Sequence, residues 1–355
     1  MSRWPREPVT VRAPATSANL GPGFDSFGLA LGLRDTVTAR ATDSGISVEV
    51  TGPGAETATA GEKHLVIRAM RTAFARIGSQ PPGITLICRN EIPQGFGLGS
   101  SAAAIVTGLL AARALAGPAG PATLPRDAVL RLATRMEGHP DNVAACLAGG
   151  LTIAWEPAAA GLGAEAGPAR PGAPMAAGPH GTAGPPGQYG PGDDTGAFQA
   201  GGSQGRPGPR VARLTPLPEI GTVLCVPETP VLTAIARQAL PAEVPHAAAA
   251  ANAARTALLV TALTSQPDLL LDATEDFLHQ HYRAAAMPAT AELISRLRGA
   301  GIPAVVSGAG PSVLAFTRSG RPGGSEVAAI ARGSGAAWRI GVLPVDTAGA
   351  TVTSG

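Results

Sequence analysis

The residues best suited to chemistry lie in the segment 93–104, P-Q-G-F-G-L-G-S-S-A-A-A. Three glycines at alternate positions and then two serines stand out in it: Gly95, Gly97, Gly99, Ser100 and Ser101. Glycine tolerates positive φ angles and lets the backbone approach a ligand closely. The unpaired N–H groups at the start of a helix expected over 102–115 favour an anion. With a strand expected at 84–88, the pattern predicts a strand–loop–helix unit that binds a polyphosphate.

Two common phosphate-binding loops do not fit this segment. A Walker loop requires a lysine before its Ser or Thr, and the single lysine of the chain, Lys63, lies outside the segment. A dinucleotide-binding loop requires G-x-G-x-x-G and an acidic residue about 20 residues later. The glycines here have a different spacing, and the next carboxylate is Asp127. We therefore expect a phosphate loop that works without a lysine.

A second candidate is the loop expected over 13–24, which is rich in glycine and proline; Asn19 lies within it and Asp25 follows it directly. An asparagine or aspartate in a loop often bonds its own backbone. A purely local role is therefore the alternative to ligand binding at both positions.

A third candidate is the segment E-G-H-P-D-N, expected at the end of a helix. Glu137 would oppose the helix dipole there, and a Mg²⁺ shared with nucleotide phosphates would compensate; an exposed glutamate that needs no compensation is the alternative. His139 has no second histidine at ligand spacing, which argues against zinc. Asp141 and Asn142, expected on an irregular segment, suit a carboxylate that accepts a hydroxyl proton or a simple Asx turn.

Two arginines and a glycine turn complete the candidates. Arg237 lies on a helix expected after Pro230, and Arg283 ends the segment D-F-L-H-Q-H-Y-R. Arginine suits bidentate recognition of a carboxylate or phosphate, although most single arginines are solvated surface groups. The turn S-G-A-G-P-S, which contains Gly308, is expected between two strands. Its backbone N–H groups would suit an anion, and a plain turn is the alternative.

The composition excludes several classes of protein. The 355 residues are 45% hydrophobic and 15% charged with a formal charge of +2, so no basic surface for nucleic acid is indicated. The widely spaced Cys88, Cys146 and Cys225 favour buried thiols in a reducing compartment over disulfides or zinc ligands. No signal region and no apolar run of about 18 residues is recognised. We therefore expect a cytoplasmic protein that binds neither nucleic acid nor a membrane.

The elements that would position the candidate residues alternate between strands and helices. The patterns predict strands at 9–12, 33–42, 46–51, 84–88, 149–155, 221–227, 303–307, 313–317 and 338–343. They predict helices at 61–77, 102–115, 125–136, 232–240, 247–264, 269–281, 289–299 and 326–332. Two strand–helix–strand halves indicate an α+β protein with an N-terminal domain at 1–155 and a C-terminal domain at 212–345.

Two further segments are expected to lack regular structure. Residues 157–209 are almost all Gly, Ala and Pro and cannot bury enough apolar surface to offset their ordering entropy. We therefore predict a disordered insertion at 156–211, with a partner-binding linker as the alternative. A flexible tail is expected at 346–355.

Four motifs together resemble those of a known family, the GHMP small-molecule kinases. They are V-R-A-P-A-T-S-A-N-L-G-P-G-F-D-S-F-G-L-A-L, P-x-x-x-G-L-G-S-S-A-A, E-G-H-P-D-N-V-A and S-G-A-G-P-S. The S-A-N-L-G-x-G-F-D loop, the compact H-P-D-N and the segments 233–237 and 276–283 are similar to members that phosphorylate L-homoserine. The resemblance covers the chain except for the insertion and the two tails.

The resemblance implies a two-domain GHMP kinase fold, with a ribosomal S5-like N-terminal domain, a ferredoxin-like C-terminal domain and both substrates in the cleft between them. It implies ATP and Mg²⁺ as cofactors and the conversion of L-homoserine to O-phospho-L-homoserine, a step of threonine biosynthesis. Another GHMP kinase and a non-catalytic ligand sensor stay alternatives, because pocket residues rather than the fold determine the substrate. A homodimer is left open as the assembly.

The resemblance also implies roles for individual residues. The ATP phosphates would be wrapped by Pro93, Gln94, Gly95, Phe96, Gly97, Leu98, Gly99, Ser100, Ser101, Ala102 and Ala103. Mg²⁺ would lie near Ser100 and Glu137, which form the implied catalytic set together with Asp141 and Asn142. The amino-acid pocket would be lined by Asn19, Asp25, His139, Asn142, Arg237, Arg283 and Gly308. In this pocket Asp25 suits the substrate ammonium and the arginines suit its carboxylate. The hydroxyl would meet either Asp141 as a base or Asn142.

Overall fold

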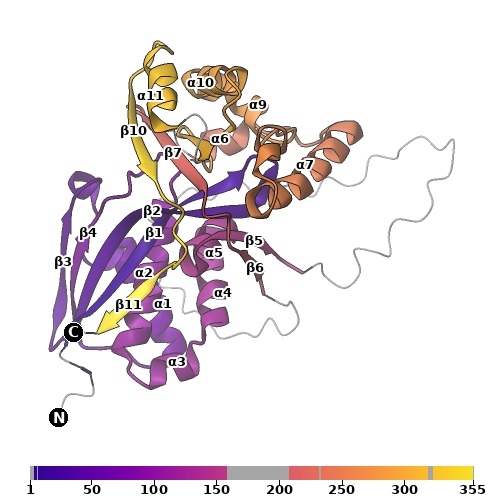
Figure 1. Cartoon of the computed structure of the whole chain (residues 1–355). Coiled ribbons are helices and arrows are strands. Elements are labelled where there is room, and N and C mark those ends of the chain that lie inside the picture. Colours follow the sequence, from indigo (N-terminus) through magenta and orange to yellow (C-terminus); the bar gives the residue numbers. More distant parts are fainter. Residues whose placement is uncertain (1–3, 6, 158–207, 232, 319–322, 355) are drawn as a thin grey trace. The chain divides into compact units, whose positions relative to one another are not determined.

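The computed structural model describes residues 4–5, 7–157, 208–231, 233–318 and 323–354. Residues 1–155 and 209–355 form one compact unit (Figure 1). Most of the insertion predicted at 156–211 lies outside the described residues. At its end, however, β6 (Arg210–Leu214) already pairs with β5 (Leu151–Trp155), so the predicted boundary at 212 falls within a strand of the first domain's sheet.

The first sheet has seven strands in the order β11–β1–β2–β4–β3, with β5 paired to β2 and β6 to β5. The remaining bounds are β1 (Val9–Leu20), β2 (Gly23–Thr42), β3 (Gly45–Thr51), β4 (Gly83–Arg89) and β11 (Thr351–Ser354). All neighbours are antiparallel except β3 and β4, which are parallel. β1 and β2 form one long hairpin that runs through the sheet (Figure 1).

The loop predicted at 13–24 is instead the closed end of this hairpin. Every residue from Ala13 to Leu20 is buried, so the strand lacks the alternation of apolar and polar residues that marks a half-exposed strand. Small residues, Pro14 and the turn glycines give the segment a loop-like composition instead. The segment is a strand because its backbone pairs in antiparallel register with β2, and this pairing cannot be recognised from the local sequence.

The prediction of a flexible tail at 346–355 is wrong. Thr351–Ser354 form β11, which pairs with Val9–Arg12 at the start of β1 in antiparallel register. The preceding Asp346 is buried, and its Oδ1 accepts bonds from the N–H groups of Ala348 and Gly349. The end of the chain therefore returns to the first sheet and completes its edge.

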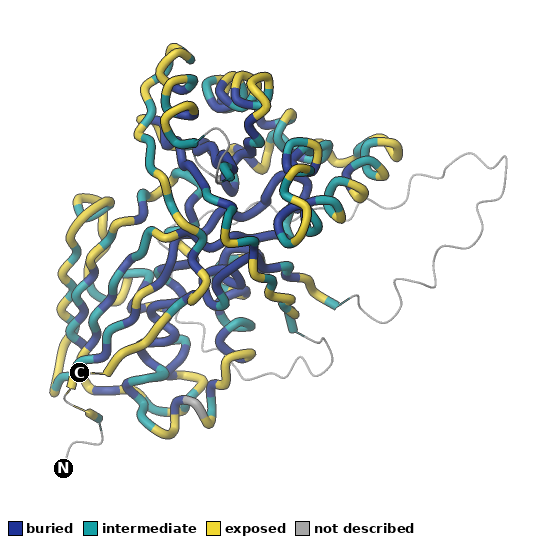
Figure 2. The backbone as a smooth tube through the Cα atoms, in the orientation of Figure 1, coloured by how far each residue is buried: buried dark blue, intermediate teal, exposed yellow. Residues whose placement is uncertain are grey.

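Helices cover one side of this sheet. Their bounds are α1 (Leu65–Ile77), α2 (Ser100–Leu115), α3 (Ala119–Thr123), α4 (Arg126–Glu137) and α5 (Asp141–Ala148), preceded by short 3₁₀ turns at Ala55–Thr57 and Gly61–Lys63. α2 and α5 pack on β1 and β2, while α1 and α4 pack on α2. α2 is buried almost all round, as its apolar composition predicts (Figure 2).

The second sheet has four antiparallel strands in the order β10–β7–β9–β8. The bounds of its elements are β7 (Ile220–Pro227), α6 (Thr233–Gln238), α7 (His246–Thr264), α8 (Leu270–Ala273), α9 (Gln280–Arg283), α10 (Pro288–Gly299), β8 (Ala304–Val306), β9 (Val313–Arg318), α11 (Gly324–Arg332) and β10 (Trp338–Leu343). Further 3₁₀ turns lie at Pro267–Leu269 and Ala284–Ala286. Helical segments join β7 to β8, and α11 joins β9 to β10, which gives the βαββαβ connectivity of a ferredoxin-like domain. The predicted fold class is confirmed.

The single helix predicted over 269–281 is wrong, because α8 and α9 are separated by the segment 274–279. Asp276 explains the interruption. Its carboxylate accepts bonds from the N–H groups of Leu278, His279 and Gln280, in competition with helical hydrogen bonds.

The expectation that no apolar run could span a membrane also needs correction. Among the described residues one helix, α7, is long and apolar enough by length and composition, with a mean hydropathy of 1.2. In this structure the polar Asn252 and Thr256 of α7 bond the carbonyl of Pro22, and Arg255 pairs with Glu275. These contacts show α7 packed against other parts of the chain.

Candidate functional site

The predicted phosphate loop joins the end of β4 to the first turn of α2. Gly95, Gly97 and Gly99 have φ angles of +80°, +71° and +67°, so all of the alternate glycines adopt the left-handed conformation. Gly99 is the residue before the helix, and no side chain caps the N–H groups that follow it. The loop thus presents uncapped backbone donors at the start of a buried helix, which suits an anion.

The loop lies in direct contact with two other segments. A Cβ atom on Gly97 would come within 2.1 Å of the Ser307 carbonyl oxygen, and the Ser307 hydroxyl donates to the Gly97 carbonyl at 2.8 Å. On the other side, a Cβ on Gly99 would come within 2.0 Å of Thr16 Oγ1, while the Thr16 N–H donates to the Leu98 carbonyl at 3.0 Å. The loop is therefore held between β1 and the turn after β8.

Ser101 contacts Glu137, which is predicted to lie near Mg²⁺ together with Ser100. The Ser101 hydroxyl donates to Glu137 Oε2 at 2.8 Å, which links the first turn of α2 to the last residue of α4. Burial raises the pKa of Glu137, and the bond from Ser101 and the nearby His139 partly offset this effect. A desolvated carboxylate at the start of α2 has the right chemistry for Mg²⁺, which commonly binds one or two carboxylates together with substrate phosphates.

Asp141 lies at the start of α5, not on the irregular segment that was predicted, and it is completely buried. Its Oδ1 lies 2.6 Å from His139 Nδ1 and accepts the Asn142 N–H at 2.7 Å. Its Oδ2 is also buried and has no hydrogen-bond partner among the described residues. Burial opposes the charge of His139, but the bond to Asp141 and the fields of Asp141 and Glu137 raise its pKa above the usual value.

Asn142 is oriented by β1. The Thr16 hydroxyl donates to Asn142 Oδ1 at 2.7 Å, and both residues are buried. Thr16 is also the residue whose N–H binds the phosphate loop at Leu98. A single residue of β1 therefore connects the phosphate loop to the Asp141–Asn142 pair.

The turn between β1 and β2 carries the other acidic candidate. Asn19 and Asp25 both have positive φ angles, and Asn19 Oδ1 accepts the Asp25 N–H at 2.8 Å, which is the local role that Asx residues often have. The Asp25 side chain points outward and pairs with Arg237 Nη2 of α6 at 3.0 Å. Both side chains of this pair are 40% exposed.

Arg283 is 1% exposed, which is unusual for an arginine. Its Nε donates to the Ala236 carbonyl at 3.1 Å, and its Nη1 lies 3.3 Å from the Gly308 carbonyl and 3.2 Å from His279 Nδ1. The guanidinium also lies over the Phe24 ring at 5.4 Å. Burial lowers the pKa of Arg283, with the charge of Arg237 acting in the same direction.

The predicted anion nest at Gly308 is not supported. Its N–H donates to the Ala18 carbonyl at 2.9 Å, and the Gly310 N–H donates to the Ser307 carbonyl at 2.8 Å. These donors are therefore already used within the protein. The Gly308 carbonyl instead supports Arg283.

Comparison with known proteins places this arrangement in a family. The GHMP kinases N terminal domain matches residues 64–150, and the GHMP kinases C terminal domain matches residues 254–333. A homoserine kinase from Streptomyces coelicolor is 48% identical over 344 residues, which cover 97% of this chain and 94% of that protein. The chain belongs to the GHMP kinase family.

Further relatives agree with this assignment. A homoserine kinase from Clavibacter michiganensis is 44% identical over 347 residues, covering 97% of this GHMP kinase and 93% of the relative. The crystal structure of a homoserine kinase from Cytophaga hutchinsonii superposes with a TM-score of 0.73 at 23% identity, covering 98% of both chains. A mevalonate kinase structure superposes with a TM-score of 0.59 at 11% identity, covering 95% of this chain and 99% of that one. These two structures share the fold.

A cavity beside the phosphate loop was not predicted from the sequence. Its volume is about 250 Å³, and Gln94, Ser100 and Ser101 of the loop line it. The cavity is also lined by residues 57–59, by residues 64–66 at the start of α1 and by Asn90. These lining residues form no recognisable motif in the sequence. Only their position next to the predicted phosphate loop identifies them as candidate ligand-binding residues.

The remaining residues that are predicted to wrap the phosphates differ in how far they are buried. Ala102 and Ala103 are buried in α2, and Leu98 is buried below the loop. Pro93 precedes the exposed Gln94, and Phe96 packs against the core with the Arg339 guanidinium 6.0 Å from its ring centre. The half-buried aromatic ring at position 96 thus anchors the loop to the core and has an arginine of β10 close to it.

Proposed function

We propose that this GHMP kinase transfers the terminal phosphoryl group of ATP to the hydroxyl of L-homoserine, releasing ADP and O-phospho-L-homoserine. The observation that carries the proposal is that Thr16 of β1 contacts both the phosphate loop and the Asp141–Asn142 pair. Uncapped donors of the phosphate loop lie on one side of Thr16, and the buried Asp141–Asn142 pair lies on the other. Relatives named homoserine kinase, 40–48% identical over nearly the whole chain, indicate the substrate.

The phosphates would meet the start of α2 and the glycine loop, with Mg²⁺ at Glu137 and Ser100. Among the described residues no group of three or more His, Cys, Asp and Glu could hold a metal ion. The phosphates would therefore supply the remaining ligands, as is usual for Mg²⁺ at a nucleotide. The bound cation would neutralise charge that develops on the transferred group. The 250 Å³ cavity next to Ser100 and Ser101 would receive another part of the nucleotide.

The pair of Asp25 and Arg237 suggests how the amino acid binds. An exposed ion pair contributes only ~0–1 kcal/mol, so separating it costs little. The substrate ammonium can replace Arg237 at Asp25, and the substrate carboxylate can replace Asp25 at Arg237. Each charged group then keeps an opposite partner. Arg283 would add a second, rigidly held guanidinium at the carboxylate end.

Asp141 Oδ2 is the group best placed to accept the proton of the attacking hydroxyl. It is buried and without a partner, while Oδ1 is already bonded to His139 and to the Asn142 N–H. Asn142, oriented by Thr16, would contact the same hydroxyl. Phosphoryl transfer depends mainly on positioning and charge neutralisation, so both residues would act largely by aligning the nucleophile.

The test is ADP release in the presence of Mg²⁺ with L-homoserine, mevalonate and a sugar as acceptors. We expect turnover with L-homoserine alone. Turnover only with another acceptor would identify a different GHMP kinase, and ATP binding without turnover would indicate a ligand sensor. Arg237→Ala should raise the KM for homoserine and leave the KM for ATP nearly unchanged.

The assembly and location of the protein stay predictions. We propose that the chain acts on small molecules in the cytoplasm, with a homodimer as the assembly to be tested. Sedimentation equilibrium of the purified chain measures its mass in solution directly. A mass equal to that of one chain over the working concentration range would reject the dimer.

A further inference from the structure

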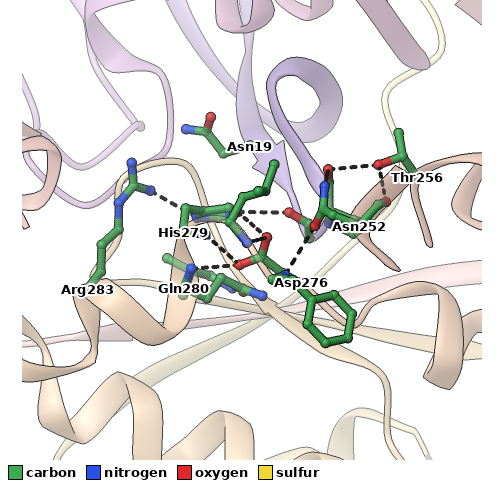
Figure 3. A network of polar contacts seen from close by, with 12 residues as sticks. Asn19, Asn252, Thr256, Asp276, His279, Gln280 and Arg283 are labelled. Carbon is green, nitrogen blue, oxygen red and sulfur yellow. Dashed lines mark hydrogen bonds and ion pairs between the residues drawn. The ribbon is translucent and has the colours of Figure 1, made fainter. Parts of the chain in front are cut away.

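The closed end of the β1–β2 hairpin is held by residues from a distant part of the chain (Figure 3). The Pro22 carbonyl accepts bonds from Asn252 Nδ2 at 2.8 Å and from the Thr256 hydroxyl at 2.9 Å. The adjacent Gly21 carbonyl lies 2.8 Å from His279 Nε2. Both carbonyls lie between the candidate residues Asn19 and Asp25, and both are bonded to side chains from the distant segment.

The partners of His279 define its protonation. The Gly21 carbonyl can only accept, so Nε2 must carry a hydrogen. Arg283 Nη1 can only donate, so Nδ1 must be unprotonated. The ring is completely buried, and burial lowers the pKa of His279, which agrees with a neutral imidazole. The one tautomer that satisfies both contacts is the one with hydrogen on Nε2.

The segment around His279 is itself rigid. The Asp276 carboxylate accepts the N–H groups of Leu278, His279 and Gln280, and Gln280 Oε1 accepts the Val306 N–H at 2.6 Å. Phe24 of the hairpin turn lies against the His279 ring with centres 5.2 Å apart. The imidazole therefore has little freedom to rotate away from either of its partners.

We propose that His279 is a positioning residue that couples the Asn19–Asp25 turn to the Arg283 guanidinium, so that the groups for the amine and carboxylate ends of the substrate are held at a constant separation. The proposal rests on the proposed function, because it takes an amino acid as the ligand. Within the described residues Arg283 Nη2 forms no hydrogen bond, in contrast to Nε and Nη1. The carboxylate would bind at this remaining nitrogen.

Two substitutions separate the two contacts. The Gln side chain in His279→Gln can place its amide nitrogen near the position of Nε2 and keep the bond to Gly21, but it offers no acceptor at the position of Nδ1. The Asn side chain in His279→Asn can place its amide oxygen near Nδ1 and keep the bond from Arg283, but it does not reach Gly21. The first variant disturbs the carboxylate end and the second disturbs the amine end.

The experiment compares kcat/KM for L-homoserine with that for two analogues. One is aminopropanol, which is homoserine without its carboxylate, and the other is gamma-hydroxybutyrate, which is homoserine without its amine. We expect each variant to lose about tenfold with homoserine, since each loses one buried hydrogen bond in a charged site. The loss in His279→Gln should vanish with aminopropanol and persist with gamma-hydroxybutyrate. His279→Asn should show the reverse pattern.

A second pair of variants tests the same coupling without changing the histidine. Thr256→Val removes a donor to Pro22, whereas Thr264→Val removes a hydroxyl of the same helix that bonds only the Val260 carbonyl four residues earlier. Thr256→Val should follow the pattern of His279→Asn with a smaller loss of a few-fold, and Thr264→Val should match the wild type with all compounds.

The outcomes are distinct. A wild-type protein without homoserine turnover would overturn the proposed function and this inference with it. Wild-type turnover, combined with equal losses of both histidine variants across all compounds, would overturn the inference alone, because general structural damage does not depend on which substrate group is present. A Thr256→Val variant that is indistinguishable from Thr264→Val would also count against it.

Discussion

Replacing Gly97 by alanine tests how closely the phosphate loop must approach its neighbours. The added Cβ would lie 2.1 Å from the Ser307 carbonyl oxygen and 2.8 Å from the Gly310 carbonyl oxygen, whereas ordinary contacts begin at 3.4 Å. Both obstacles are backbone atoms, so the loop or the turn must move by about 1 Å. A displacement of this size in a phosphate site costs about 100-fold in rate. We expect kcat/KM for ATP to fall by that factor.

The matched control is Gly45→Ala. Gly45 has a φ of +72°, nearly equal to the +71° of Gly97, but a Cβ there would have no atom within 4 Å. Both variants should therefore lose the same ~1–2 kcal/mol of stability from the left-handed backbone, in addition to the clash in Gly97→Ala. Steady-state kinetics and urea unfolding of both variants measure the two effects. A Gly97→Ala enzyme with the kinetics of Gly45→Ala would refute the argument from close approach.

Three further predictions follow from the titratable groups. Glu137→Gln should raise the Mg²⁺ concentration for half-maximal rate at least about tenfold, because an amide does not neutralise the cation; an unchanged Mg²⁺ titration would remove Glu137 from the metal site. Burial raises the pKa of the Cys88 and Cys225 thiols to about 12 and also raises that of Cys146, so no cysteine should react with a thiol reagent until the chain unfolds. Burial lowers the pKa of His279 in the folded protein. As the pH is lowered, this histidine is therefore protonated first in the unfolded chain, near the ordinary histidine pKa of about 6.5. The contribution of His279 to stability should be complete above that pH and decline as the pH falls below it, and urea titrations at about pH 7 and pH 5 should show a smaller decline in His279→Gln.

The sequence predicted the parts of the site that depend on local conformation. Positive φ angles at Gly95, Gly97 and Gly99 and a helix directly after them follow from residue type, and the structure confirms them. The extended hairpin over 13–24 could not be predicted, because a strand that is buried on both faces and built from small residues lacks period-two alternation. The strand β11 depends on pairing with β1 at the other end of the chain, and no local pattern reports that.

For side-chain contacts too, the sequence predicted individual residues but not the contacts that depend on the tertiary structure. Asp25 and Arg237 were each predicted to bind the substrate, but their pairing with one another joins residues from β2 and α6 and depends on the tertiary structure. Thr16 and His279 lie inside motifs that the sequence displays, yet their role as connectors was missed because it depends on bonds to distant segments. Their partners, Asn142 and Gly21, are far away in sequence.

The connections between distant segments bear on how the two substrates would be bound together. The phosphate loop bonds Ser307 at Gly97, the next residue Gly308 bonds the Ala18 carbonyl on β1, and the Gly308 carbonyl bonds Arg283. A movement of the Ser307 turn would therefore displace the loop and the guanidinium at the same time. Since these contacts are shared, we expect a ligand that orders one of the two proposed sites to stabilise the other, and any such coupling must be equal in both directions. The close packing at Gly97 would thus serve the proposed amino-acid pocket as well as the proposed phosphate site.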